Sequence, residues 1–134
     1  KANEMEHVLE IARSLGHEGV VLNDPVAKDR LVEELLRARV MLYRGDVNET
    51  FCLAVGEAQA MGVPAVVEKL GSVSERVIDG ETGFVAAGAA VFAEAAKRLL
   101  TDDDLWRAQH LAAIEKQRQW CWADAAAAFE KLIP

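Results

Sequence analysis

Apolar residues recur every three or four positions along two early segments of the chain, residues 2–15 and 26–39, and this spacing predicts amphipathic helices. In the second helix, Leu31, Leu35 and Leu36 are expected to face inward. Shorter runs that are apolar throughout predict buried strands. These runs are residues 19–22, 40–43, 64–67 and 84–85. Helices separate the strands, so we predict one α/β domain with a parallel, Rossmann-like sheet and helices on both of its faces.

Further helices are predicted after the third strand and beyond Gly88. They cover residues 72–78, 89–100, 102–117 and 120–133. Asp102 to Asp104 are well placed to cap and charge the helix that begins with them. The intervening sequence DGETG, residues 79–83, is typical of a turn because its two glycines permit positive φ.

The helix predicted at residues 51–61 is apolar on nearly every side, yet Glu57 lies in its middle and Glu49 just precedes it. Ligands of parallel sheets bind beyond the carboxyl ends of the strands, where Glu49 would lie. The first amides of this helix have no intrahelical partner and suit a phosphate. They belong to Thr50, Phe51, Cys52 and Leu53. Glu57 would lie roughly 9 Å along the axis, where a carboxylate could accept hydrogen bonds from a ribose diol.

Simpler roles for these residues remain open. Glu49 could only compensate the helix dipole, and Glu57 could lie on a thin exposed stripe with Gln59. Against the second role, the helix has no broad polar face, and burying an unpaired carboxylate is costly. Cys52 at a helix N-terminus would have a lowered pKa in principle, although we interpret it as a small packed residue rather than a nucleophile.

The sequence NETFCLAVGEAQAMGVPAVVEKLGSVSERVIDGETGFV, residues 48–85, resembles the donor-binding segment of the group 1 family of retaining glycosyltransferases with the GT-B fold. In that family, two glutamates separated by seven residues precede a Gly-x-Pro strand, a glycine-rich turn, a further glutamate and a turn like DGETG. The matching positions are Glu49, Phe51, Cys52, Glu57, Gly62, Pro64, Gly71, Glu75 and residues 79–83. The tail QWCWADAAAAFEKLIP is similar to the closing amphipathic helix of the family.

The resemblance implies transfer of a hexose from a nucleoside-diphosphate sugar with retention at the anomeric carbon. Glu49 would be the catalytic residue and contact the donor sugar, Glu57 would bind the ribose, and the amides of residues 50–53 would contact the diphosphate. The family normally needs no metal and no cofactor, because helix dipoles and basic side chains balance the phosphate charge. The rim of the donor pocket would include Arg44, Gly71, Ser72 and Glu75. Arg44 could be a compensating phosphate ligand, although an arginine at such a position is more often a solvated loop residue. Glu75 could equally cap the short helix.

The chain departs from the family pattern in three respects. Tyr43 and Arg44 replace the usual Pro-Ser pair, and Cys52 replaces a glycine, so its Cβ would crowd a phosphate. The opening strands with their diphosphate clamp, and the acceptor-binding N-terminal domain, do not occur in this sequence. We therefore expect residues 1–134 to be part of a donor-binding domain, with closing helices at 89–134. Such a fragment would be inactive alone and could oligomerise through an exposed sheet edge at residues 19–22.

The net charge of −7 without a basic stripe argues against a nucleic-acid partner, but not against a small anion, because backbone amides act locally. Cys52 and Cys121 lie far apart and no metal ligands cluster, so neither a disulfide framework nor a metal site is expected. No apolar run approaches the ~18 residues of a membrane span. We expect a cytoplasmic protein or domain, with peripheral membrane association of a longer enzyme left open.

The histidines and tryptophans give no catalytic pattern. His7, His17 and His110 are scattered and are expected at the surface or as caps. The tryptophans are expected to pack in the core or against the sheet rather than to form a platform for a sugar; they are Trp106, Trp120 and Trp122. Two other functions remain open. One is a non-catalytic Rossmann-like module for nucleotide binding or assembly. The other is a receiver-like flavodoxin fold, which would need an acidic cluster and a lysine that are not evident.

Overall fold

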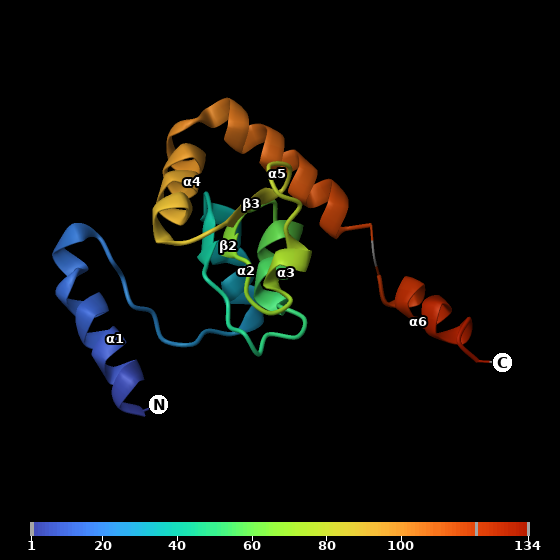
Figure 1. Ribbon diagram of the computed structural model, residues 1–134, viewed down its shortest axis with the longest axis horizontal. Coiled ribbons are helices and arrows are strands. Elements are labelled where there is room, and N and C mark those ends of the chain that lie inside the picture. The colour runs from blue at the N-terminus through green and yellow to red at the C-terminus, as the bar shows by residue number, and fades with distance from the viewer. Residues whose placement is uncertain (1, 120, 134) are drawn as a thin grey trace. The chain divides into compact units, whose positions relative to one another are not determined.

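A computed structural model describes residues 2–119 and 121–133, and its elements are labelled in Figure 1. The chain divides into two compact units, Lys1–Leu31 and Val32–Pro134. The helices are α1 (Ala2–Ser14), η1 (Gly16–Glu18), α2 (Lys28–Arg37), α3 (Leu53–Ala60), η2 (Val73–Arg76), α4 (Ala89–Thr101), α5 (Asp103–Gln117) and α6 (Trp122–Glu130), where η marks a 3-10 helix. The strands are β1 (Met41–Tyr43), β2 (Ala65–Glu68) and β3 (Gly83–Ala86).

The strand predicted at residues 19–22 is wrong. Gly19 ends η1 with a φ of 95°, and the Val20 amide donates to the Leu15 carbonyl at 3.3 Å. The side chains of Val20, Val21 and Leu22 are 41%, 73% and 47% exposed. A strand needs a partner for its hydrogen-bond ladder, and no described strand pairs with this segment. The sheet edge that we expected at this position therefore does not form.

Helix α2 is confirmed, but its expected burial is not. No residue of α2 is buried, and the side chains of Leu31 and Leu36 are 36% and 63% exposed. Periodicity predicts which face of a helix is apolar, but it does not predict whether another element covers that face.

The predicted parallel sheet is confirmed in the second unit. Its order is β1-β2-β3, with Met41 opposite Ala65 and Ala65 opposite Gly83. Successive β2 side chains point to opposite faces, so Ala65 and Val67 join one core and Val66 joins another. The central strand β2 is therefore covered on both faces, as its apolar sequence predicted.

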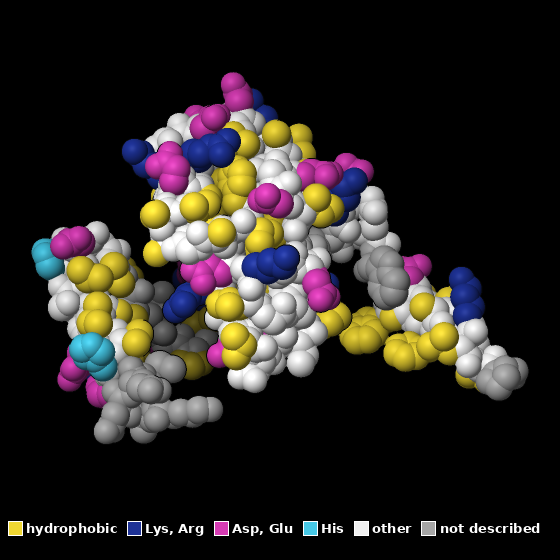
Figure 2. Space-filling model, viewed as in Figure 1, with side chains coloured by type: hydrophobic (Ala, Val, Ile, Leu, Met, Phe, Trp, Pro, Cys, Tyr) yellow, Lys and Arg dark blue, Asp and Glu magenta, His cyan; other side chains and the backbone are white. Residues whose placement is uncertain are grey.

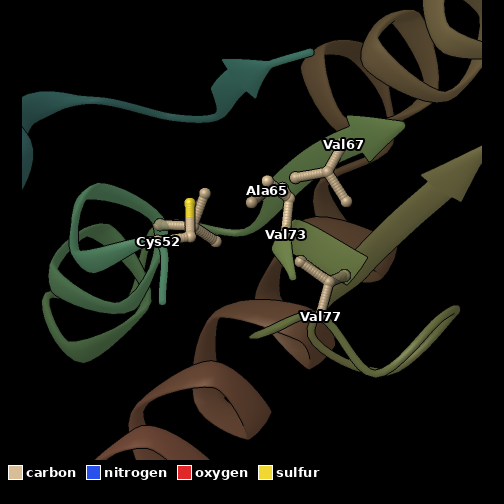
Figure 3. Packing of buried hydrophobic residues seen from close by; sticks show 6 residues of the cluster. Cys52, Ala65, Val67, Val73 and Val77 are labelled. Carbon is tan, nitrogen blue, oxygen red and sulfur yellow. The ribbon is translucent and has the colours of Figure 1, made fainter. Parts of the chain in front are cut away.

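Different helices cover the two faces. The first core joins the sheet to α3 and η2, and Figure 3 shows its side chains converging between them. Its buried members are Cys52, Val55, Ala65, Val67, Val73 and Val77. The second core joins the sheet to α4, and its buried members are Val66, Ala86, Ala95, Ala96 and Leu99. Helix α5 then packs against α3 and α4, and Asp102 caps it by accepting a hydrogen bond from the Leu105 amide at 3.0 Å.

A buried polar network links α3 to α5 and to the turn at residues 79–83. Gln59 is fully buried, not exposed as one of our sequence alternatives had it. Its Nε2 donates to the Thr82 carbonyl at 2.9 Å, and its Oε1 accepts from Gln117 Nε2 at 2.8 Å. Gln117 also donates to the Arg76 carbonyl at 3.2 Å. The amide of Gln59 is thus paired on both ends, which a buried polar group requires.

The aromatic residues of the last helices differ in burial. Trp106 is half-buried, donates to the Arg39 carbonyl at 2.7 Å and stacks on His110, with ring centroids 4.8 Å apart. Trp122 is 91% exposed, so the prediction that it packs in the core is wrong, and Trp120 lies outside the described residues. Figure 2 shows further apolar side chains exposed along α6, the helix that bears Trp122. The sequence of α6 was sufficient to predict a helix but not a packing partner.

Helix α3 begins at Leu53, two residues later than predicted, because Cys52 precedes it in a left-handed conformation with φ 51° and ψ 64°. Among the described residues, Cys52 is the single non-glycine residue with positive φ, and its side chain is 2% exposed. For an L-residue this conformation costs roughly 1–2 kcal/mol.

Replacing Gln59 with Ala should lower the free energy of unfolding by about 2–4 kcal/mol, because it opens a cavity and removes the partner of Thr82 and Gln117. Urea unfolding measures this. Gln119→Ala is the matched control, since Gln119 is exposed and its loss should change stability by less than about 0.5 kcal/mol. Equal effects of the two substitutions would contradict the role of the network.

Cys52→Gly should be more stable than Cys52→Ala by about 1 kcal/mol, because both remove the thiol but only glycine relieves the left-handed strain. The same urea experiment compares the two variants. If the alanine variant were equally stable, the strain at this helix start would be disproved.

Candidate functional site

The candidate site lies where β1 ends and α3 begins. Glu49 is half-buried in the loop between them. Its Oε2 accepts a hydrogen bond from the Tyr43 hydroxyl at 2.8 Å, and its Oε1 accepts one from the Cys52 amide at 3.2 Å. A strand and a helix start thus each hold one oxygen of the same carboxylate.

This contact alters the acidity of Tyr43. Its hydrogen bond to Glu49 raises the pKa of Tyr43 to about 12, with further contributions from burial and from the negative charge of Glu49. Because the phenol keeps its proton at neutral pH, it donates, and the carboxylate stays an acceptor. A carboxylate has about four acceptor positions, so two hydrogen bonds leave room for others.

The start of α3 only partly matches the predicted row of free amides. Thr50 and Phe51 precede the helix, and the Cys52 amide already donates to Glu49. Of the four residues whose amides we predicted to face a phosphate, Leu53 lies within the first turn. The prediction of a helix start at Phe51 is therefore wrong, because Cys52 has a left-handed conformation and the helix begins after it. The side chains of Phe51 and Leu53 are 60% and 63% exposed.

Burial decides the chemistry of Cys52. Its thiol packs among the valines of the first core (Figure 3). Burial raises the pKa of this thiol, while the Val55 amide and the positive charge of Arg76 lower it and Glu49 raises it further. A small packed residue is thus the better description, and the lowering that its place at a helix start suggested is outweighed.

Arg76 brings a positive charge to the helix start, which the sequence analysis missed. Its guanidinium carbon lies 3.8 Å from the centroid of the Phe51 ring, and its Nε donates to the Phe51 carbonyl at 2.7 Å. The residue is on η2, 25 positions from Phe51, and no local sequence signal connects the two. The dipole of α3 and this guanidinium both favour an anion here.

The glycine turn after β2 supports the Glu49 loop. The Glu49 carbonyl accepts from the Ser72 amide at 2.9 Å. Gly71 has a φ of 52°, and a Cβ at this position would lie 2.6 Å from the Asp46 carbonyl oxygen and 2.7 Å from that of Glu49. Two of the predicted rim residues, Gly71 and Ser72, are therefore beside Glu49, whereas the side chain of Glu75 is exposed on η2.

Arg44 belongs to a different part of the sheet edge. Its Nε pairs with Glu68 Oε2 at 3.1 Å, and the two line a hollow at the start of α4 with Gly88, Ala89 and Phe92. Tyr43, the preceding residue, packs on the α3 side instead. Arg44 is thus not brought together with Glu49, because side chains alternate across a sheet.

Glu57 lies half-buried on α3, between the buried residues Val55 and Ala58. It lies four residues beyond Leu53, or about 6 Å along the axis. The two glutamates of the motif therefore belong to one loop-helix unit, as the spacing predicted.

The described residues hold no group of three or more His, Cys, Asp or Glu side chains that could bind a metal ion. In the same residues, no helix is long and apolar enough to cross a bilayer. On the face shown in Figure 2, Lys and Arg side chains are interspersed with Asp and Glu side chains and form no basic stripe.

Known proteins resemble this chain over nearly its whole length. The chain is 36% identical over 134 residues to the D-inositol 3-phosphate glycosyltransferase of Corynebacterium diphtheriae, covering 98% of this chain and 31% of the relative. The same enzyme of Nocardia farcinica is 34% identical over 122 residues, covering 89% of this chain and 27% of the relative. The chain thus spans about a third of the length of these relatives.

The fold also has a counterpart among solved structures. Sucrose-phosphate synthase from Thermosynechococcus elongatus superposes with a TM-score of 0.78 at 22% identity, covering 97% of this chain and 33% of that chain. The predicted Rossmann-like fold of a GT-B glycosyltransferase fragment is therefore confirmed.

The sequence model of the family described as "Glycosyl transferases group 1" matches residues 2–102, which is most of the chain. The resemblance expected from the Glu49–Glu57 motif is thus confirmed, and the chain belongs to the group 1 glycosyltransferases.

Proposed function

We propose that this chain is part of the donor-binding half of a glycosyltransferase that transfers a hexose from a nucleoside-diphosphate sugar with retention of configuration. The observation that carries the proposal is the Glu49 carboxylate, which two hydrogen bonds hold in front of α3. Its remaining acceptor positions suit the hydroxyls of a sugar.

The rest of the donor would follow along the same helix. The diphosphate would rest at the start of α3, where the helix dipole and Arg76 supply positive charge. Glu57, about 6 Å further along, would accept hydrogen bonds from the ribose. This arrangement needs no metal or cofactor, since a guanidinium and backbone amides can balance a diphosphate.

The acceptor site would come from the part of a longer enzyme that this chain does not contain. The chain spans 31% of the length of its Corynebacterium diphtheriae relative, so we infer that it is inactive alone. Appreciable hexosyl transfer by the 134 residues alone would contradict this inference.

One observation favours a second candidate, a non-catalytic module that assembles through a sheet edge. Within the described residues β1 pairs on one side only, and its Leu42 is 52% exposed. An open apolar edge promotes association.

UDP-glucose or GDP-mannose should raise the melting temperature of the chain, and Glu57→Gln should abolish the rise because an amide replaces the acceptor for the ribose diol. At a ligand concentration a hundred times Kd, the stabilisation is about 2.7 kcal/mol. Differential scanning fluorimetry measures the shift.

Glu94→Gln is the matched control, since Glu94 is exposed on α4 and should leave the shift unchanged. If no nucleotide sugar stabilises the chain, and size-exclusion chromatography reveals an oligomer that grows with concentration, the assembly module is the better description.

A further inference from the structure

Tyr43 is a residue at which this chain departs from the usual family pattern, and its side chain has two roles. Its ring packs against the first core. Its hydroxyl reaches past the end of β1 and donates to Glu49 Oε2 at 2.8 Å. A rigid strand thus fixes the carboxylate of a loop residue.

The second oxygen of Glu49 is held as well. The Cys52 amide donates to Oε1 at 3.2 Å, and the backbone of Glu49 is itself tied down by the Ser72 amide at 2.9 Å. Of these contacts, only the one from Tyr43 comes from a side chain, and the Tyr43 hydroxyl and the Cys52 amide together set the plane of the carboxylate. Groups that are oriented before a ligand arrives bind it more tightly.

We propose that Tyr43 is a positioning residue for the sugar end of the donor, because its hydroxyl orients the Glu49 carboxylate toward the hydroxyls of a nucleotide-linked hexose. The inference rests on the proposed function for the identity of the ligand. Loss of the hydroxyl should weaken binding of a nucleotide sugar. It should spare binding of the nucleoside diphosphate, which lacks the hexose.

The contact can be tested without any ligand. Tyr43 is the single tyrosine of the sequence, so the ultraviolet absorption of tyrosinate reports on this residue. Its pKa of about 12 depends chiefly on the hydrogen bond to Glu49, with Cys52 and Asp46 adding smaller charge effects.

Between pH 9 and 11 the Tyr43 phenol should stay protonated in the wild type. In Glu49→Gln the pKa of Tyr43 should fall toward 10, so the phenol should ionise in this range. Circular dichroism confirms that both proteins are folded in this range. Because the folded pKa exceeds the unfolded value, the contact stabilises the fold fully below pH 10, and this stabilisation is lost as the pH rises through about 12. A wild-type midpoint near 10 would overturn the proposal.

Tyr43→Phe should raise the Kd of UDP-glucose or GDP-mannose about tenfold and leave the Kd of UDP or GDP within about twofold, because only the sugar contacts depend on the hydroxyl. Isothermal titration calorimetry measures the Kd of both ligands for each variant. The phenylalanine keeps the ring in the core, so the fold should persist. In Glu49→Gln the further change Tyr43→Phe should have no added effect on sugar-nucleotide binding.

Thr101→Val is the control for removing a hydroxyl elsewhere. The exposed Thr101 hydroxyl donates to the Lys97 carbonyl of its own helix at 2.9 Å, so this variant should bind both ligands normally. If Tyr43→Phe weakens both ligands equally, or neither, Tyr43 does not position the sugar, although the proposed function survives. If the wild type binds neither ligand, the proposed function fails and this inference fails with it.

Discussion

The central strand β2 is buried on both of its faces, and the position of the candidate site follows from that burial. Ala65 and Val67 point into the core beneath α3 and η2, while Val66 points into the core beneath α4. Because interiors are closely packed, neither layer can shift without disturbing the other. The ends of β1 and β2, and the loops that follow them, are therefore held at one edge of the sheet.

At that edge the site depends on backbone geometry more than on charge. The left-handed turn at Cys52 directs its amide to Glu49, and the turn at Gly71 allows the Glu49 loop to approach closely. A side chain at Gly71 would occupy the space of two carbonyl oxygens. These two positions of positive φ bring the loop close enough for the Tyr43 hydroxyl and the Cys52 amide to orient the Glu49 carboxylate. Arg76 then adds a positive charge beside it.

The polar network around Gln59 holds the other end of α3. Gln59 and Gln117 connect α3, α5 and the backbone at Thr82 and Arg76, so the helix that carries Glu57 is fixed at both of its ends. Buried amides of this kind are costly unless each is paired, and the pairing specifies one arrangement of the helices. The orientation of the candidate site thus depends on contacts between residues that are far apart in sequence.

The sequence was sufficient for most of what depends on local pattern. Apolar runs and helical spacing predicted the three parallel strands, most helix bounds, the Asp102 cap and, through the Glu49–Glu57 motif, the family. It was also sufficient to predict that β2 is covered on both faces, because a strand buried on both sides shows a continuous apolar run and no alternation of apolar and polar residues.

Tertiary structure decided which segments pair as strands, which side chains are buried and which polar groups find hydrogen-bond partners. The run at residues 19–22 has the composition of a strand but no described strand beside it, and the exposed Trp122 has the composition of a core residue. Conversely, Gln59 is polar and fully buried, because distant groups satisfy its amide. Hydrogen-bond partners and covering surfaces come from elsewhere in the chain, so local sequence determined the elements of this protein, and only the folded chain determined which side chains they bury and which carboxylate they orient.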